Sequence, residues 1–156
     1  ASIMLATDVS GSMKATDVAP NRLAAAKSAA KTFLDSVPAK VNVGVMAFNQ
    51  VPTILQSPTK DREAATAAID QEEISGTTAT GDAVTAALKA LENAPGAKTG
   101  TPPAAIVLLS DGKSTRGSDP IEAAQKARDA KVRHAMTTSF GFGCQNVSLV
   151  MSREPA

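Results

Sequence analysis

Three oxygen-bearing side chains stand at alternate positions near the start of the chain: Asp8, Ser10 and Ser12. They follow the apolar run Ile3 to Ala6, at the point where a β-strand is expected to end. Residues two positions apart in an extended segment point the same way, so the carboxylate and both hydroxyls can face one ligand. Oxygen donors of this kind suit a hard divalent cation such as Mg²⁺.

Two further oxygen donors follow later predicted elements. Thr78 lies in a polar segment before a predicted helix, and Asp111 follows the strongly apolar run Ala104 to Ser110. In open α/β sheets, ligands bind beyond the carboxyl ends of the strands, so these loops are expected to converge. Taken alone, the segment from Asp8 to Ser12 is equally typical of an ordinary Ser or Asp turn, and Thr78 and Asp111 are each more typical of a turn than of a metal ligand. Together they predict a metal site formed by Asp8, Ser10, Ser12, Thr78 and Asp111.

The composition restricts what could hold a metal. One cysteine, Cys144, and one histidine, His134, exclude an internal disulfide, a multi-thiolate site and an imidazole cluster. We expect His134 to be a strand residue and Cys144 a packing residue, without a catalytic role. A metal must therefore be held by oxygen.

The balance of charge and hydropathy argues against some partners. The 16 Lys and Arg residues and 15 Asp and Glu residues are spread along the chain, which gives no indication of nucleic acid binding. No apolar run approaches the roughly 18 residues that cross a bilayer, so we expect no direct membrane insertion by this segment. Because the chain opens within its first predicted strand, we expect a soluble domain excised from a larger protein.

Apolar runs and amphipathic patterns alternate along the chain, which predicts an α/β domain with a mostly parallel sheet covered on both faces. The predicted strands are Ser2 to Thr7, Val41 to Phe48, Thr53 to Gln56, Ala104 to Ser110 and Val132 to Phe140. The predicted helices are Arg22 to Val37, Asp61 to Gln71, a segment containing Val84 to Leu91, and Pro120 to Ala130. The short second-to-third strand connection predicts that Thr53 to Gln56 is antiparallel and at an edge.

The end of the chain lacks a clear amphipathic pattern. We expect one domain over residues 1–143 and an irregular tail over residues 144–156, with either a frayed extension or a partial helix from Val147 to Met151. The strand Val132 to Phe140 is less apolar than a buried parallel strand, so we expect it near an edge of the sheet.

The five predicted ligands, in this order and on these elements, resemble the metal-ion-dependent adhesion site of von Willebrand factor A domains, written DxSxS, then Thr, then Asp. The stretch LATDVSGSMKATDVAPNRLAAAKSAA is most similar to bacterial membrane-anchored members of the aerotolerance type. The resemblance runs from Ser2 to about Gly143 and implies a Rossmann-like, doubly wound fold with one short antiparallel edge strand. It also implies Mg²⁺, Mn²⁺ or Ca²⁺, held by the serines and threonine directly or nearly so, and by the aspartates directly or through water.

The same resemblance implies a non-enzymatic module for adhesion or assembly, in which an Asp or Glu of a partner protein completes the coordination. If Asp8 and Asp111 both bind a doubly charged ion, the site is neutral; if one stands behind a water, the ion attracts an outside carboxylate. We expect a monomeric domain, located outside the cytoplasm as part of a bacterial membrane protein. An accessory module of a metal-chelatase or secretion-type complex would keep the same ion site.

Two enzyme classes are also compatible with a Rossmann-like sheet. A phosphohydrolase of the haloacid dehalogenase type needs a second carboxylate where this chain has Ser10, so its proton relay is missing. A serine hydrolase needs a GxSxG turn and a histidine on a late loop, whereas Ser12 lacks that pattern and His134 falls on a predicted strand. Both classes are therefore less favoured than protein binding.

Overall fold

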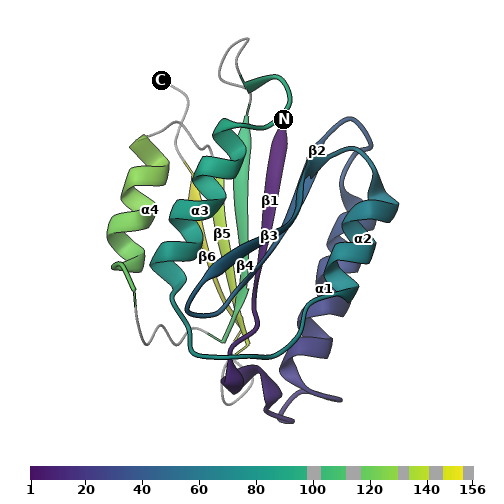
Figure 1. Ribbon diagram of the computed structural model, residues 1–156, viewed down its shortest axis with the longest axis vertical. Coiled ribbons are helices and arrows are strands. Elements are labelled where there is room, and N and C mark those ends of the chain that lie inside the picture. The colour runs from purple at the N-terminus through teal and green to yellow at the C-terminus, as the bar shows by residue number, and fades with distance from the viewer. Residues whose placement is uncertain (98–102, 112–116, 130–133, 141–145, 153–156) are drawn as a thin grey trace.

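A six-stranded sheet in the order β3-β2-β1-β4-β5-β6 runs through the computed structural model, with helices on both faces (Figure 1). The structure describes residues 1–97, 103–111, 117–129, 134–140 and 146–152. The strands are β1 (Ser2–Asp8), β2 (Asn42–Phe48), β3 (Pro52–Thr59), β4 (Ala104–Ser110), β5 (His134–Phe140) and β6 (Asn146–Ser152). The helices are α1 (Arg22–Ser36), α2 (Arg62–Asp70), α3 (Thr80–Glu92), α4 (Pro120–Asp129) and a short 3-10 helix, η1 (Gly11–Lys14). Within these ranges, no helix is both long enough and apolar enough to cross a membrane.

The four central strands are parallel, and an antiparallel strand closes each edge. β1 pairs with β2 on one side and β4 on the other, and β5 pairs with β4. β3 and β6 are antiparallel to β2 and β5 respectively. The predicted α/β, Rossmann-like class is confirmed, with two antiparallel edge strands instead of one. Because β1 lies between β2 and β4, the loop that follows it emerges at the middle of the carboxyl edge.

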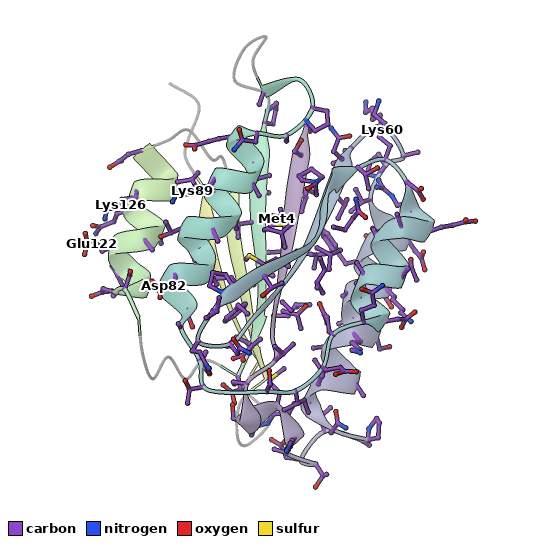
Figure 2. The ribbon with its side chains drawn as sticks, in the orientation of Figure 1. Met4, Lys60, Asp82, Lys89, Glu122 and Lys126 are labelled. Carbon is purple, nitrogen blue, oxygen red and sulfur yellow. The ribbon has the colours of Figure 1, made fainter. Side chains whose placement is uncertain are left out.

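Side chains that alternate along the strands form two cores, one on each face of the sheet. Leu5 of β1 packs in the core beneath α1 and α2. Met4, its neighbour, packs in the core beneath α3 and α4 (Figure 2). On the outer side of that second layer, Lys126 and Glu122 of α4 form an ion pair of 2.9 Å. The near-continuous apolar strands of the sequence are thus explained by burial on both faces.

The prediction of an irregular tail or a partial helix is wrong for Asn146–Ser152, which forms β6. The backbone of β5 supplies the pairing that this segment lacks in isolation, and a helix of that length is marginal without tertiary contacts. The alternation of Val147, Leu149 and Met151 was the available sequence signal. β6 takes the outer position, so β5 is one strand in from the edge. Cys144 and the predicted boundary at residue 143 lie outside the described residues.

The other boundaries differ from the predictions at loops and edges. β3 spans Pro52–Thr59 rather than Thr53 to Gln56, with irregular register opposite Val45. Its prolines are tolerated because an edge strand has one side without partners for its N–H groups. Residues 98–102 of the predicted loop Gly96 to Pro103, and the start of the predicted strand at Val132, lie outside the described residues.

Gly81, in the first turn of α3, allows this helix to approach the segment before α4. A Cβ atom at this position would collide with the backbone carbonyl of Ser118. Glycine-to-alanine changes inside helices usually stabilise by about 1 kcal/mol. We expect Gly81→Ala instead to lower the free energy of unfolding by about 1 to 3 kcal/mol, as overpacking does. Urea unfolding measures this change, with Ser28→Ala on the exposed part of α1 as the control. A Gly81→Ala variant that is more stable than the wild type would contradict the expectation.

Candidate metal centre

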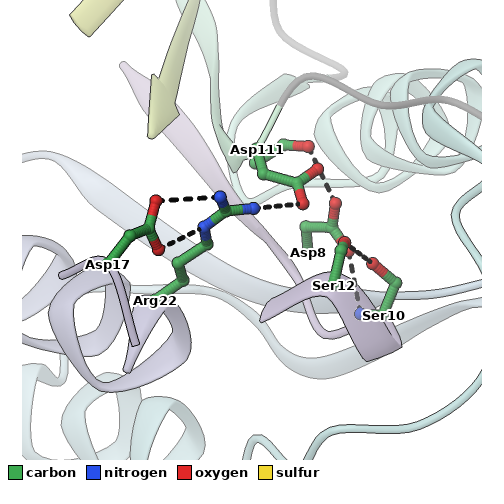
Figure 3. A network of polar contacts seen from close by, with 7 residues as sticks. Asp8, Ser10, Ser12, Asp17, Arg22 and Asp111 are labelled. Carbon is green, nitrogen blue, oxygen red and sulfur yellow. Dashed lines mark hydrogen bonds and ion pairs between the residues drawn. The ribbon is translucent and has the colours of Figure 1, made fainter. Parts of the chain in front are cut away.

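Asp8, the last residue of β1, is fully buried and hydrogen-bonded through both carboxyl oxygens (Figure 3). Its Oδ1 accepts a bond of 2.8 Å from the Ser10 backbone N–H, and its Oδ2 accepts one of 2.8 Å from the Ser110 hydroxyl. The Ser10 and Ser12 hydroxyl oxygens are 3.1 Å apart. The structure therefore brings the three residues of the first loop together at the end of β1.

The first loop reaches this arrangement by a route that differs from the predicted extended turn. Ser10 is extended, but the chain then enters η1, where Met13 N–H donates to the Ser10 carbonyl at 3.0 Å. The Met13 side chain is fully buried in the core beneath α1 and α2, which anchors η1 against the domain. The serine hydroxyls meet because the helical turn folds Ser12 back, and simple alternation does not apply beyond Ser10.

The segment that carries Thr78 is bonded to the first loop through the backbone. Ser75 N–H donates to the Val9 carbonyl at 2.7 Å, and Gly11 N–H donates to the Gly76 carbonyl at 3.0 Å. The Thr78 residue is 3% exposed. Two bonds between loops that are far apart in sequence thus place the threonine segment beside the serine pair.

Asp111 directly follows β4 and is held by an arginine that sequence reasoning did not assign to the site. Arg22 Nη1 donates to Asp111 Oδ2 at 3.0 Å, while Nε and Nη2 donate to the two Asp17 oxygens at 2.8 and 2.9 Å (Figure 3). Arg22 is only 3% exposed. Its one sequence signal was a cation in the first turn of α1, where the helix dipole disfavours positive charge.

The carboxylates of the site titrate under opposing influences. Burial raises the pKa of Asp8 above its ordinary value and is the largest cause; the Asp111 charge adds to it, and hydrogen bonds from Ser10 and Ser110 oppose it. The hydrogen bond from Arg22 lowers the pKa of Asp17. A carboxylate buried near a second negative charge, as Asp8 is, resists ionisation unless a positive charge compensates it.

The donor chemistry of the assembled residues fits a hard cation. Within the described ranges, no three His, Cys, Asp or Glu side chains gather as a possible metal cluster. Mg²⁺ retains several waters and needs only a few protein oxygens. The serine pair, the buried Thr78 and the two aspartates provide such a set at the carboxyl edge of the sheet.

Residues 3–113 match the von Willebrand factor type A domain, and the chain belongs to this family. A UPF0353 protein of Mycolicibacterium vanbaalenii is 45% identical, over 98% of this chain and 48% of the relative. The chain thus spans about half the length of the curated relatives it matches.

Two solved structures share the fold. An aerotolerance-related membrane protein from Bacteroides fragilis gives a TM-score of 0.75 at 22% identity, covering 97% of this chain and 81% of that chain. BatB, described as a conserved hypothetical protein from Bacteroides thetaiotaomicron, gives 0.74 at 22% identity, covering 97% of this chain and 80% of that chain. The family resemblance noted from the sequence is confirmed, and the predicted similarity to aerotolerance-type proteins extends to the fold.

Proposed function

We propose that this domain binds a divalent cation, Mg²⁺, Mn²⁺ or Ca²⁺, and presents it to an acidic residue of a partner protein. The observation that carries the proposal is the serine hydroxyl pair, 3.1 Å apart, beside a buried aspartate at the carboxyl edge of the sheet. The proposed ligands, direct or through water, are Asp8, Ser10, Ser12, Thr78 and Asp111.

The charge distribution supports capture of a carboxylate. Both Asp8 oxygens accept hydrogen bonds, and one Asp111 oxygen accepts from Arg22. The hydroxyl oxygens of Ser10 and Ser12, which are also proposed ligands, are neutral. An ion held chiefly by hydroxyls and water keeps most of its positive charge and attracts an outside Asp or Glu side chain.

The same residues favour a binding module over an enzyme. Position 10, where phosphoryl-transfer chemistry of the dehalogenase type would need a carboxylate, holds a serine whose hydroxyl contacts Ser12. His134 lies on β5, as predicted, and not on a loop of the carboxyl edge. We propose a non-catalytic domain, working outside the cytoplasm in a bacterial membrane protein; the related fold from Bacteroides fragilis is itself described as a membrane protein.

Capture of partner proteins tests the proposal. The immobilised domain is exposed to an envelope extract of its own source, with Mg²⁺ or with chelator, and bound proteins are identified by mass spectrometry. We expect chelator, or Asp111→Asn, to reduce recovery of a specific partner by about tenfold or more, which corresponds to about 1.4 kcal/mol. The amide keeps an oxygen for Arg22 while removing the charge.

Asp35→Asn is the matched control, because Asp35 is exposed on α1. This variant should recover the partner as the wild type does. A set of bound proteins that is the same with Mg²⁺ and with chelator would indicate a purely structural module and contradict cation-dependent binding.

A further inference from the structure

Arg22 is a buried cation whose location is set by two carboxylates. It begins α1, where the helix dipole opposes a positive charge, and it is 3% exposed. Burying a guanidinium is unfavourable unless it is ion-paired and hydrogen-bonded. Asp17 and Asp111 provide that compensation, with three hydrogen bonds of 2.8 to 3.0 Å between them (Figure 3).

The two carboxylates hold the guanidinium differently. Asp17, whose side chain is 33% exposed, accepts from Nε and Nη2, so it forms a bidentate ion pair with the Arg22 guanidinium. Asp111, whose side chain is 1% exposed, accepts from Nη1. Asp17 therefore competes with Asp111 for the guanidinium and accepts two of these three bonds.

A metal ion bound by Asp111 would therefore have a fixed positive charge as a near neighbour. Arg22 Nη1 is 3.0 Å from Asp111 Oδ2, so the guanidinium repels the ion and also takes up part of the negative charge of this carboxylate. Both effects act in a buried setting, where charges are weakly screened by water and salt. The affinity for the bare cation falls, and the bound ion is left less neutralised.

We propose that Arg22 regulates the cation site: through its ion pair with Asp111 it weakens binding of the bare cation and preserves the positive charge that a partner carboxylate then neutralises. This inference rests on the proposed function, because it assumes that the site binds a divalent cation. Arg22 acts through Asp111 and is a positioning residue. The positive charge of Arg22, and not its shape alone, lowers the affinity of the site for the cation.

The test is calorimetric titration of the 156-residue chain with Mn²⁺ alone, comparing wild type with Arg22→Gln. We expect Arg22→Gln to bind Mn²⁺ about tenfold more tightly, and to keep this gain at high salt because buried charges are poorly screened. The cation-free variant should melt at a lower temperature, since Asp111 loses its partner. A purely structural role predicts the lower melting temperature with weaker or unchanged Mn²⁺ binding.

Two variants separate charge from shape. Arg22→Lys keeps the positive charge and should bind Mn²⁺ within about twofold of wild type, since an ammonium still repels the ion. Lys14→Gln removes an exposed cation two residues from Ser12, and any gain should be small and vanish at high salt. A gain for Lys14→Gln equal to that for Arg22→Gln would overturn the proposal.

Asp17→Asn tests the inference even if Arg22→Gln does not fold. Loss of the competing carboxylate turns the guanidinium towards Asp111, so Mn²⁺ should bind several-fold more weakly than in the exposed-site control Asp35→Asn, also at high salt. Equal Mn²⁺ affinity in these two variants, or no gain in a folded Arg22→Gln, overturns the role of Arg22. Absence of Mn²⁺ binding by the wild type overturns the proposed function itself, and the inference with it.

Discussion

Replacing Asp8 with alanine is expected to abolish the thermal stabilisation that Mg²⁺ or Mn²⁺ gives the domain. An ion at about 100 times its dissociation constant stabilises the folded state by about 2.7 kcal/mol. For a domain of this size, that raises the melting temperature by roughly 5 to 10 °C. Asp8 is fully buried at the end of the central strand, so its replacement removes the carboxylate at the centre of the proposed site. Thermal melting with cation and with chelator measures the shift.

Asp8→Asn and Asp35→Ala are the controls for this result. The amide of Asp8→Asn preserves the packing at the end of β1 without the charge, so it should lose most of the shift and still fold cooperatively. The fold should survive because burial already disfavours the charged form of Asp8, whose pKa is raised. Asp35→Ala, on the exposed face of α1, should keep the full shift. If Asp8→Ala keeps the same cation-induced rise in melting temperature as the wild type, Asp8 is not part of the cation site.

Replacing Glu72 with glutamine is expected to stabilise the protein by about 3 kcal/mol at pH 8 and to have little effect at pH 4. Glu72 is 2% exposed, and neither of its carboxyl oxygens has a hydrogen-bond partner among the described residues. Burial raises its pKa from 4.5 to about 7, against the opposing influence of the Thr7 hydroxyl and the Lys27 ammonium and with a small contribution from Asp70.

The direction of the pH dependence follows from proton binding. Between the ordinary pKa of 4.5 and the folded value of about 7, the folded protein keeps the Glu72 proton while the unfolded chain loses it. The stability associated with the neutral carboxyl is therefore complete below pH 4.5 and is lost as the pH rises to about 7. Each unit of separation corresponds to about 1.4 kcal/mol.

Urea unfolding at several pH values from 4 to 8 measures this dependence in wild type and Glu72→Gln. The neighbouring Glu73 is exposed, so Glu73→Gln should follow the wild-type pH curve and provides the matched control. Wild-type and Glu72→Gln stabilities that differ by a constant amount across the range would show that Glu72 does not titrate abnormally in the folded state.

Local sequence patterns predicted the helices and strands in which buried side chains recur at a regular interval. The limits of β4 agree with the prediction, and those of α1 and β2 differ by one residue at one end. These elements carry their own signal, since period-two and period-3.6 burial are properties of neighbouring residues. The length of β3 and the existence of β6 depend on pairing with another strand, which local periodicity does not contain.

The candidate site likewise has features that local sequence predicts and features that depend on tertiary contacts. Its spacing of Asp8, Ser10 and Ser12 is local, and its position after a strand follows from the apolar run before it. The bonds of Asp8 to Ser110 and of Arg22 to Asp111 join residues 102 and 89 positions apart. They exist because β4 pairs with β1 and α1 packs on the same sheet.

The sequence by itself determined the α/β class and the residue types of an oxygen-rich site, because both arise from short-range alternation of apolar and polar residues. Only the tertiary structure decided how that site is charged. The Arg22 guanidinium is brought to Asp111, and Glu72 is buried without hydrogen-bond partners among the described residues, by the packing of helices on the sheet. Coulombic and desolvation effects depend on distance in space and on burial, and neither quantity is encoded at the position of a single residue.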